Sequence, residues 1–216
     1  ERGDDRARPR VVIAALEIMA DRGQDALLHL QEAYEAAMEL EDAELAERLL
    51  RRIVPESSVE DSEEHAWALI ALAERCFAAG RAKPAADLWE RGARFSEPEE
   101  QRTLMLRVAD LAYRTLSDPA RSVRLLEELR TNEPADREVW MPLAEIYREQ
   151  GDVAHLATLI DETIPLVDDM RERAGLRLSL ARLLEAKEPA RAAEILADAL
   201  DEDPSAGVDV ARVHDV

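Results

Sequence analysis

The sequence has little of what forms disulfides, binds metals or spans membranes. It contains one cysteine, Cys76, among 216 residues, which excludes a disulfide within the chain and a cysteine-rich metal site. No apolar run approaches the roughly 18 residues that cross a bilayer. Residues Glu1 to Arg10 are charged and lack the apolar stretch of a signal peptide. We therefore expect a cytoplasmic protein that does not enter a membrane.

Aromatic and β-branched residues are also scarce. Aromatics make up 4% of the chain, and no run alternates apolar and polar residues as a half-buried strand does. Alanine, leucine, glutamate and arginine dominate instead, and all four are strong helix formers. The composition predicts an all-α protein.

Glycine and proline punctuate the chain at helix-length intervals. Gly23, Gly80 and Gly151 each follow a helix-like segment, where a left-handed C-terminal cap is needed. Prolines stand near the starts of the next segments, where a missing N–H costs nothing: Pro84, Pro98, Pro119, Pro189 and Pro204. Short turns between amphipathic helices force neighbouring helices to lie antiparallel.

One unit, residues 137–168, shows the repeat most clearly. Its first helix has Trp140, Leu143, Ala144 and Tyr147 on one face, and Gly151 follows at the turn. Its second helix has one apolar stripe with residues spaced three or four apart. The first helix resembles the W-x2-L-[G/A]-x2-Y core of the tetratricopeptide repeat (TPR). This resemblance implies a right-handed superhelical solenoid of antiparallel helix pairs.

Four further segments are similar to the same unit. The predicted repeats are 24–55, 66–97, 103–134, 137–168 and 173–204, with flanking helices at 9–22 and 205–216. Their anchor positions are Tyr34, Cys76, Tyr113, Tyr147 and Leu183, so Cys76 should be a core residue. Neither end is a convincing polar cap. We therefore interpret residues 1–216 as a single TPR-like solenoid cut from a longer array, with ends open to self-association.

No pattern of catalytic residues accompanies the repeat. There is no glycine-rich phosphate loop and no H-E-x-x-H, and the four histidines are far apart in sequence. No G-x-S-x-G elbow is present. We predict no catalytic, cofactor-binding or metal-binding residues, no cofactor, and no enzymatic activity.

The net charge of −20 limits the class of partner. Such a chain repels nucleic acid and anionic membranes, which bind clustered cations. The excess acid either keeps the protein soluble or selects a basic partner, and the sequence leaves both explanations open.

The resemblance also implies a ligand groove along the first helices, on the concave face. The residues of these helices that packing leaves free are Trp67, Ile70, Glu74, Leu104, Arg107, Leu111, Met141, Glu145 and Arg177. A peptide or helix, basic or amphipathic, would lie there, which predicts a protein–protein interaction scaffold. The groove residues could equally be packed against neighbouring repeats. The chain could also be a structural spacer, or a regulatory module attached to an enzyme domain outside it.

Overall fold

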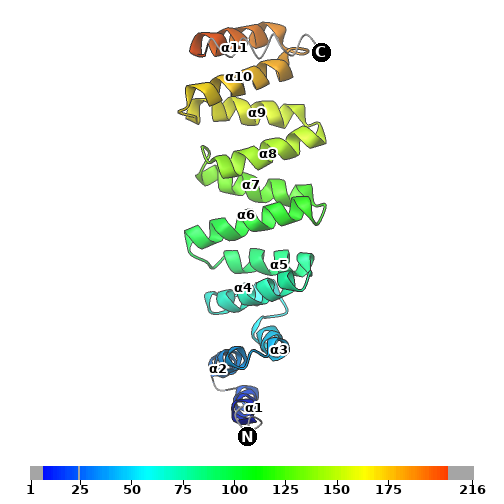
Figure 1. Cartoon of the computed structure of the whole chain (residues 1–216), viewed down its shortest axis with the longest axis vertical. Coiled ribbons are helices and arrows are strands. Elements are labelled where there is room, and N and C mark those ends of the chain that lie inside the picture. The colour runs from blue at the N-terminus through cyan, green and yellow to red at the C-terminus, as the bar shows by residue number, and fades with distance from the viewer. Residues whose placement is uncertain (1–6, 24, 204–216) are drawn as a thin grey trace. The chain divides into compact units, whose positions relative to one another are not determined.

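The computed structural model describes residues 7–23 and 25–203. They form α-helices and two 3₁₀ turns, with no strand among them. The chain divides into two compact units, Glu1–Ser117 and Asp118–Val216, which we call unit 1 and unit 2. In each unit, helices that follow one another in the chain lie against each other in antiparallel pairs (Figure 1).

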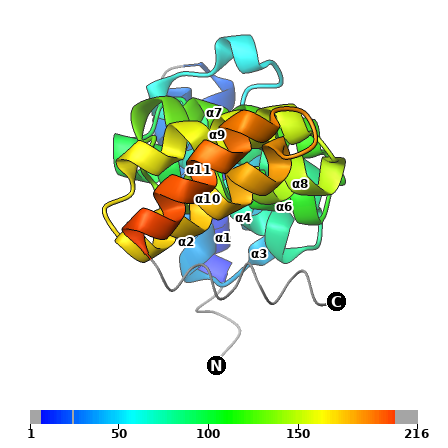
Figure 2. The same cartoon turned by 90° about the horizontal axis from the view of Figure 1, so that it is seen from above.

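Unit 1 contains six of the helices and a short 3₁₀ turn. They are α1 (Ala7–Asp21), α2 (Ala26–Glu39), α3 (Ala43–Ile53), η1 (Ser58–Glu60), α4 (Glu63–Ala78), α5 (Ala82–Ala93) and α6 (Pro98–Arg114). Unit 2 contains α7 (Pro119–Asn132), α8 (Arg137–Gln150), α9 (Val153–Thr163), η2 (Ile164–Leu166), α10 (Met170–Leu184) and α11 (Pro189–Glu202). Viewed from above, α10 and α11 lie side by side (Figure 2). The predicted flanking helix at 205–216 lies outside the described residues.

The helix boundaries follow from glycine, proline and aspartate. Gly23, Gly80 and Gly151 have φ values of 84°, 72° and 69°, the left-handed conformation expected after a helix. Proline occupies the first helical position of α6, α7 and α11, where no N–H bond is lost. Aspartate side chains accept a backbone N–H at the start of five helices: Asp42, Asp118, Asp136, Asp152 and Asp169.

The predicted anchors of the clearest repeat are core residues. Trp140, Leu143, Ala144 and Tyr147 of α8 are all buried, and Leu156, Leu159 and Ile160 of α9 are buried as well. Cys76 is buried in unit 1, as its anchor position predicted. Within each unit, the prediction of an all-α, TPR-like stack of antiparallel helix pairs is confirmed.

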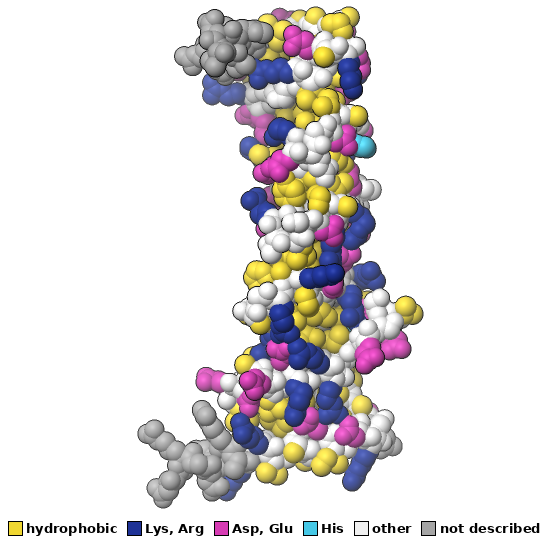
Figure 3. All heavy atoms as spheres, turned by 90° about the vertical axis from the view of Figure 1, so that its right-hand side faces the viewer, with side chains coloured by type: hydrophobic (Ala, Val, Ile, Leu, Met, Phe, Trp, Pro, Cys, Tyr) yellow, Lys and Arg dark blue, Asp and Glu magenta, His cyan; other side chains and the backbone are white. Residues whose placement is uncertain are grey.

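Arginine–carboxylate pairs join consecutive helix pairs. Arg81 Nη2 lies 2.6 Å from Glu47 Oε1, 34 residues away, and Arg107 pairs with Glu74, 33 residues away. In unit 2, Arg130 pairs with Glu162 at 2.5 Å, across 32 residues. These separations equal about one repeat, so each pair ties one repeat to the next. Figure 3 shows the two signs of charge interspersed on one face.

Arginine is suited to these contacts because its planar guanidinium can donate to two carboxylate oxygens at once. Only two of the 28 cationic residues are lysines.

Candidate functional site

A hollow of about 460 Å³ lies in unit 1 between the first half of α4 and the turn that leads into α6. Its lining divides into an apolar part and an acidic part. The apolar residues are Ala66, Trp67, Ile70, Ala71 and Phe95, and the polar residues are Glu63, Ser96, Glu97 and Glu100.

The local structure places the apolar part. Trp67 is half-buried, and its ring lies against that of Tyr34 on α2, with ring centroids 5.5 Å apart. Ile70 lies one turn further along α4 and faces α5 at Gly92, where the two helices approach closely. One side of the Trp67 ring therefore contacts Tyr34 and one side of Ile70 contacts α5, while the other side of each lines the hollow.

The α5–α6 turn places the acidic part. Phe95 and Ser96 donate their backbone N–H groups to carbonyls at the end of α5, which folds the turn back toward α4. Pro98 then starts α6, so Glu97 precedes the helix and Glu100 falls in its first turn. Carboxylates are favoured at a helix N-terminus because the helix dipole is positive there.

The carboxylates of this hollow lack the arginine partners that several other carboxylates of unit 1 have. Glu63, Glu97 and Glu100 have no ion-pair partner in the described part of the chain. By contrast, Glu47 and Glu74 in the same unit each bind an arginine. The hollow therefore combines an apolar floor with uncompensated negative charge.

The structure brings only two of the predicted groove residues, Trp67 and Ile70, into this hollow. Leu104 and Leu111 are 5% and 8% exposed, so they pack in the core of unit 1 and offer a ligand almost no surface. For these two leucines, the alternative that the groove residues pack against neighbouring helices is the one that applies.

Glu74 and Arg107 bind each other rather than an open groove. The Arg107 guanidinium lies over the buried ring of Trp89, 3.8 Å from the ring centroid, and 5.1 Å from that of Phe77. An arginine placed over aromatic faces and paired with a carboxylate stabilises the α4–α5–α6 packing. Its charge is therefore already satisfied.

The other predicted residues belong to unit 2. Met141 and Glu145 are exposed on α8, and the Arg137 side chain donates to the Met141 sulfur at 2.9 Å. Arg177 of α10 forms an ion pair with Glu202 of α11. These residues do not line the hollow of unit 1, and their role in ligand binding stays a prediction.

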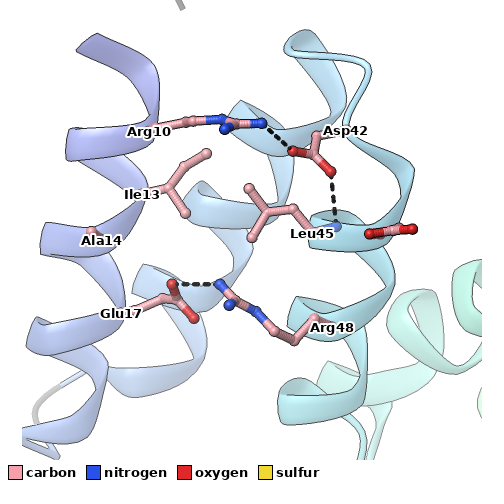
Figure 4. Close-up of a pocket in the computed structure, with 8 residues that line it drawn as sticks. Arg10, Ile13, Ala14, Glu17, Asp42, Leu45 and Arg48 are labelled. Atoms are coloured by element: carbon pink, nitrogen blue, oxygen red, sulfur yellow. Dashed lines mark hydrogen bonds and ion pairs between the residues drawn. The ribbon is translucent and has the colours of Figure 1, made fainter. Parts of the chain in front are cut away.

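A second hollow of about 540 Å³ separates α1 from α3 (Figure 4). Ion pairs cross it at both ends: Arg10 to Asp42 and Arg48 to Glu17, each at 2.9 Å. Ile13, between them, is buried. Four of its five charged lining residues are paired with each other, with Glu44 as the exception. We therefore interpret this hollow as a contact between two helices that ion pairs bridge, rather than as a ligand site.

Two further groups with shifted pKa values, the Cys76 thiol and the Asp152 carboxyl, have structural explanations. Burial raises the pKa of the Cys76 thiol, an effect that Arg81 partly opposes, so the thiol stays protonated and weakly nucleophilic. Asp152 accepts the backbone N–H of His155 and contacts its Nδ1 at 2.7 Å, which lowers the pKa of the Asp152 carboxyl. The described residues contain no cluster able to hold a metal ion. None of the described helices is long and apolar enough to cross a membrane.

Sequence reasoning missed Phe95, Glu97 and Glu100. The repeat pattern describes helix faces, whereas these residues belong to a turn and a first helical turn. One signal was present: Phe95 is a large aromatic in a polar turn directly before Glu97-Pro98. An aromatic in such a turn must either pack back on the protein or line a surface.

No family model and no curated protein matches the sequence. Several solved structures resemble it in fold. YrrB, described as a TPR protein with an unusual peptide-binding site, is 13% identical, with 92% of this chain and 98% of that chain covered and a TM-score of 0.45. A putative kinesin light chain with TPR-like repeats from Podosopora anserina is 17% identical, with 92% and 96% covered and a TM-score of 0.44.

MamA from Desulfovibrio magneticus RS-1 is 14% identical over 84% of this chain and 97% of that one, with a TM-score of 0.41. At this degree of similarity, no ligand or activity transfers from these proteins to the chain.

Proposed function

We propose that this TPR-like protein is a non-catalytic interaction scaffold, and that the hollow of unit 1 binds a basic, amphipathic peptide or helix. The proposal depends on one observation above the others. Glu63, Glu97 and Glu100 surround an apolar floor without a cation to neutralise them, in a chain where arginines pair with carboxylates elsewhere.

The apolar floor suits an aliphatic anchor side chain. Trp67, Ile70 and Phe95 offer surface that is already partly covered, so an inserted leucine or isoleucine would lose water contact on most of its area. A volume of about 460 Å³ lies within the range of typical small binding pockets. One or two apolar side chains of a peptide fit such a space.

The acidic rim suits lysine or arginine beside that anchor. A cation here would face three carboxylates, and the stem of a lysine or arginine can lie along an aromatic ring while its charged end stays in water. Contact with the face of Trp67 would add a cation–π term of about 0.5–1 kcal/mol. The partner would also be attracted at long range by the net charge of −20.

Fluorescence anisotropy tests the proposal directly. The probe is a dye-labelled amphipathic peptide with leucine anchors flanked by lysines, compared with a copy in which glutamates replace the lysines. We expect the lysine peptide to bind and the glutamate peptide not to bind. Affinity should fall as salt is raised, because exposed charges are screened over about 8 Å at physiological ionic strength.

Charge reversal locates the binding site. Glu97→Lys combined with Glu100→Lys should weaken binding about ten-fold or more, since an attraction becomes a repulsion of more than about 1.4 kcal/mol. Glu64→Lys combined with Glu99→Lys is the matched control: it makes the same change in net charge at two exposed glutamates of α4 and α6 that do not line the hollow. Equal loss in both variants would show only a general charge effect. Unchanged binding in the variant with Glu97→Lys and Glu100→Lys would exclude this hollow.

A further inference from the structure

The outer face of α1 is apolar and exposed. Val11 is 68% exposed, Ile18 55%, Val12 52% and Met19 45%, and Ala15 between them is exposed too. The opposite side of α1 holds buried Ile13 and Ala20, which pack on the rest of unit 1. Apolar side chains lie at the surface at this end of the unit (Figure 3). Contiguous exposed apolar surface of this kind marks an interaction site more often than chance.

The charges of α1 are sorted between its two sides. Both of its acids face α3, where Glu17 pairs with Arg48 and Arg52, and Asp21 pairs with Arg52 at 2.5 Å. Figure 4 shows the Glu17–Arg48 pair on that side. Among the described residues, the charged groups on the outer side are two exposed arginines, Arg8 near the start of α1 and Arg22 just past its end. A chain with a net charge of −20 thus presents one helix face that is apolar and positive.

The outer face of α11 has the complementary chemistry. Ala193, Ala197 and Leu200 are exposed there beside Glu194 and Asp201. Asp198 is exposed on the same helix, whereas Ala192 and Ala199 on the other side are buried. Small residues let another helix approach closely. The one cationic residue of α11 itself, Arg191, already pairs with Asp161 at 2.7 Å.

We propose that α1 docks on α11 of a second copy of this chain, with aliphatic side chains over the alanine surface and arginines against the acids. The two surfaces are different patches of the molecule, so the contact is heterologous and can repeat from copy to copy. A contact of one helix on one helix falls at the small end of specific interfaces, so the association should be reversible and in the micromolar range.

Sedimentation velocity across a range of protein concentrations tests the contact. The weight-average sedimentation coefficient should rise with concentration and fall back as salt is added, because the charge pairs are exposed. Arg8→Glu with Arg22→Glu should remove the rise, and so should Glu194→Arg with Asp201→Arg. Mixing these two variants should restore association about as strong as that of the wild type, because each then supplies the charge that the other lacks.

Controls separate this contact from a general effect of charge. Arg94→Glu with Arg148→Glu makes the same change in net charge at exposed arginines outside both surfaces, and should leave association unchanged. Ile18→Asp should abolish it without unfolding the protein, because the side chain is more than half exposed. A wild type that stays monomeric at every concentration overturns the proposal. Failure of the mixed charge-swap variants to associate rules out α11 as the partner surface.

Discussion

Two glycine-to-alanine substitutions should change stability in opposite directions. Gly92 lies in α5, and a Cβ built there would be 2.9 Å from Ile70 Cγ1 and 3.4 Å from Leu69 Cβ on α4. Gly175 lies in α10 with no atom within 4 Å of a Cβ. Both glycines are helical with negative φ, so backbone strain does not distinguish them.

The magnitudes follow from two effects. Alanine gains about 1 kcal/mol over glycine inside a helix. At Gly92 this gain is opposed by overpacking, which costs about 1–3 kcal/mol in a close-packed core. Ile70 is β-branched and cannot swing aside freely at Cγ1, and Leu69 is buried. Gly92→Ala should therefore lose roughly 1 kcal/mol net, whereas Gly175→Ala should gain about 0.5–1 kcal/mol.

Thermal unfolding followed by far-UV circular dichroism measures both effects. A difference of 1 kcal/mol shifts the midpoint by about 2–4 °C in a chain of this size. Gly92→Ala should also weaken peptide binding at the hollow, because Ile70 has to move. Equal stabilisation by the two substitutions would show that α4 and α5 do not approach as closely as described, and the reasoning about Ile70 would fail with it.

Two further predictions concern buried polar contacts. Arg91→Ala should destabilise unit 1 by about 3 kcal/mol in urea unfolding, because it leaves Asp61, whose side chain is 1% exposed, without its cation. Arg91→Lys should recover only part of this, since Arg91 also donates to the Pro55 carbonyl at 2.8 Å and lysine cannot reproduce the fork; full recovery would contradict the argument. Burial, and secondarily the hydrogen bond that the Tyr147 hydroxyl donates to Glu127, raises the pKa of Tyr147 to about 12. The folded state therefore favours the neutral phenol. The stability that this preference contributes is complete below the unfolded pKa of about 10 and is lost as pH rises through about 12. The loss should reach roughly 2–3 kcal/mol and be absent in Tyr147→Phe, and a parallel pH dependence in both proteins would contradict it.

The fold was predictable because its signals are local. Trp140, Tyr147 and Gly151 occupy positions that helix periodicity and turn chemistry fix on their own, and the structure places them as expected. Asp118-Pro119 marks a helix start for the same reason. The contacts of these residues lie within one helix pair, and the residue spacing in a single sequence is enough to predict them.

The site was less predictable because it depends on contacts between helix pairs. Leu104 and Leu111 were expected to face a ligand, yet helix periodicity does not say which adjacent helix covers a given side of α6. Arg107 was expected to be available, but its partners Glu74 and Trp89 lie on two other helices. Whether a long side chain reaches such partners depends on the distance between helices, which residue spacing alone does not define.

The arginine–carboxylate pairs have a consequence for how the repeats can be exchanged. Glu47 is matched to Arg81 in the next helix pair, and Glu74 is matched to Arg107 in the one after. At each junction one repeat supplies the carboxylate and the next supplies the arginine, and the positions of these two residues differ from one junction to the next. Deleting or duplicating an internal repeat would bring unmatched halves together, even where the apolar anchors still align. Repeats of this chain are consequently not interchangeable modules, and a shuffled array should need its charges redesigned at each new junction.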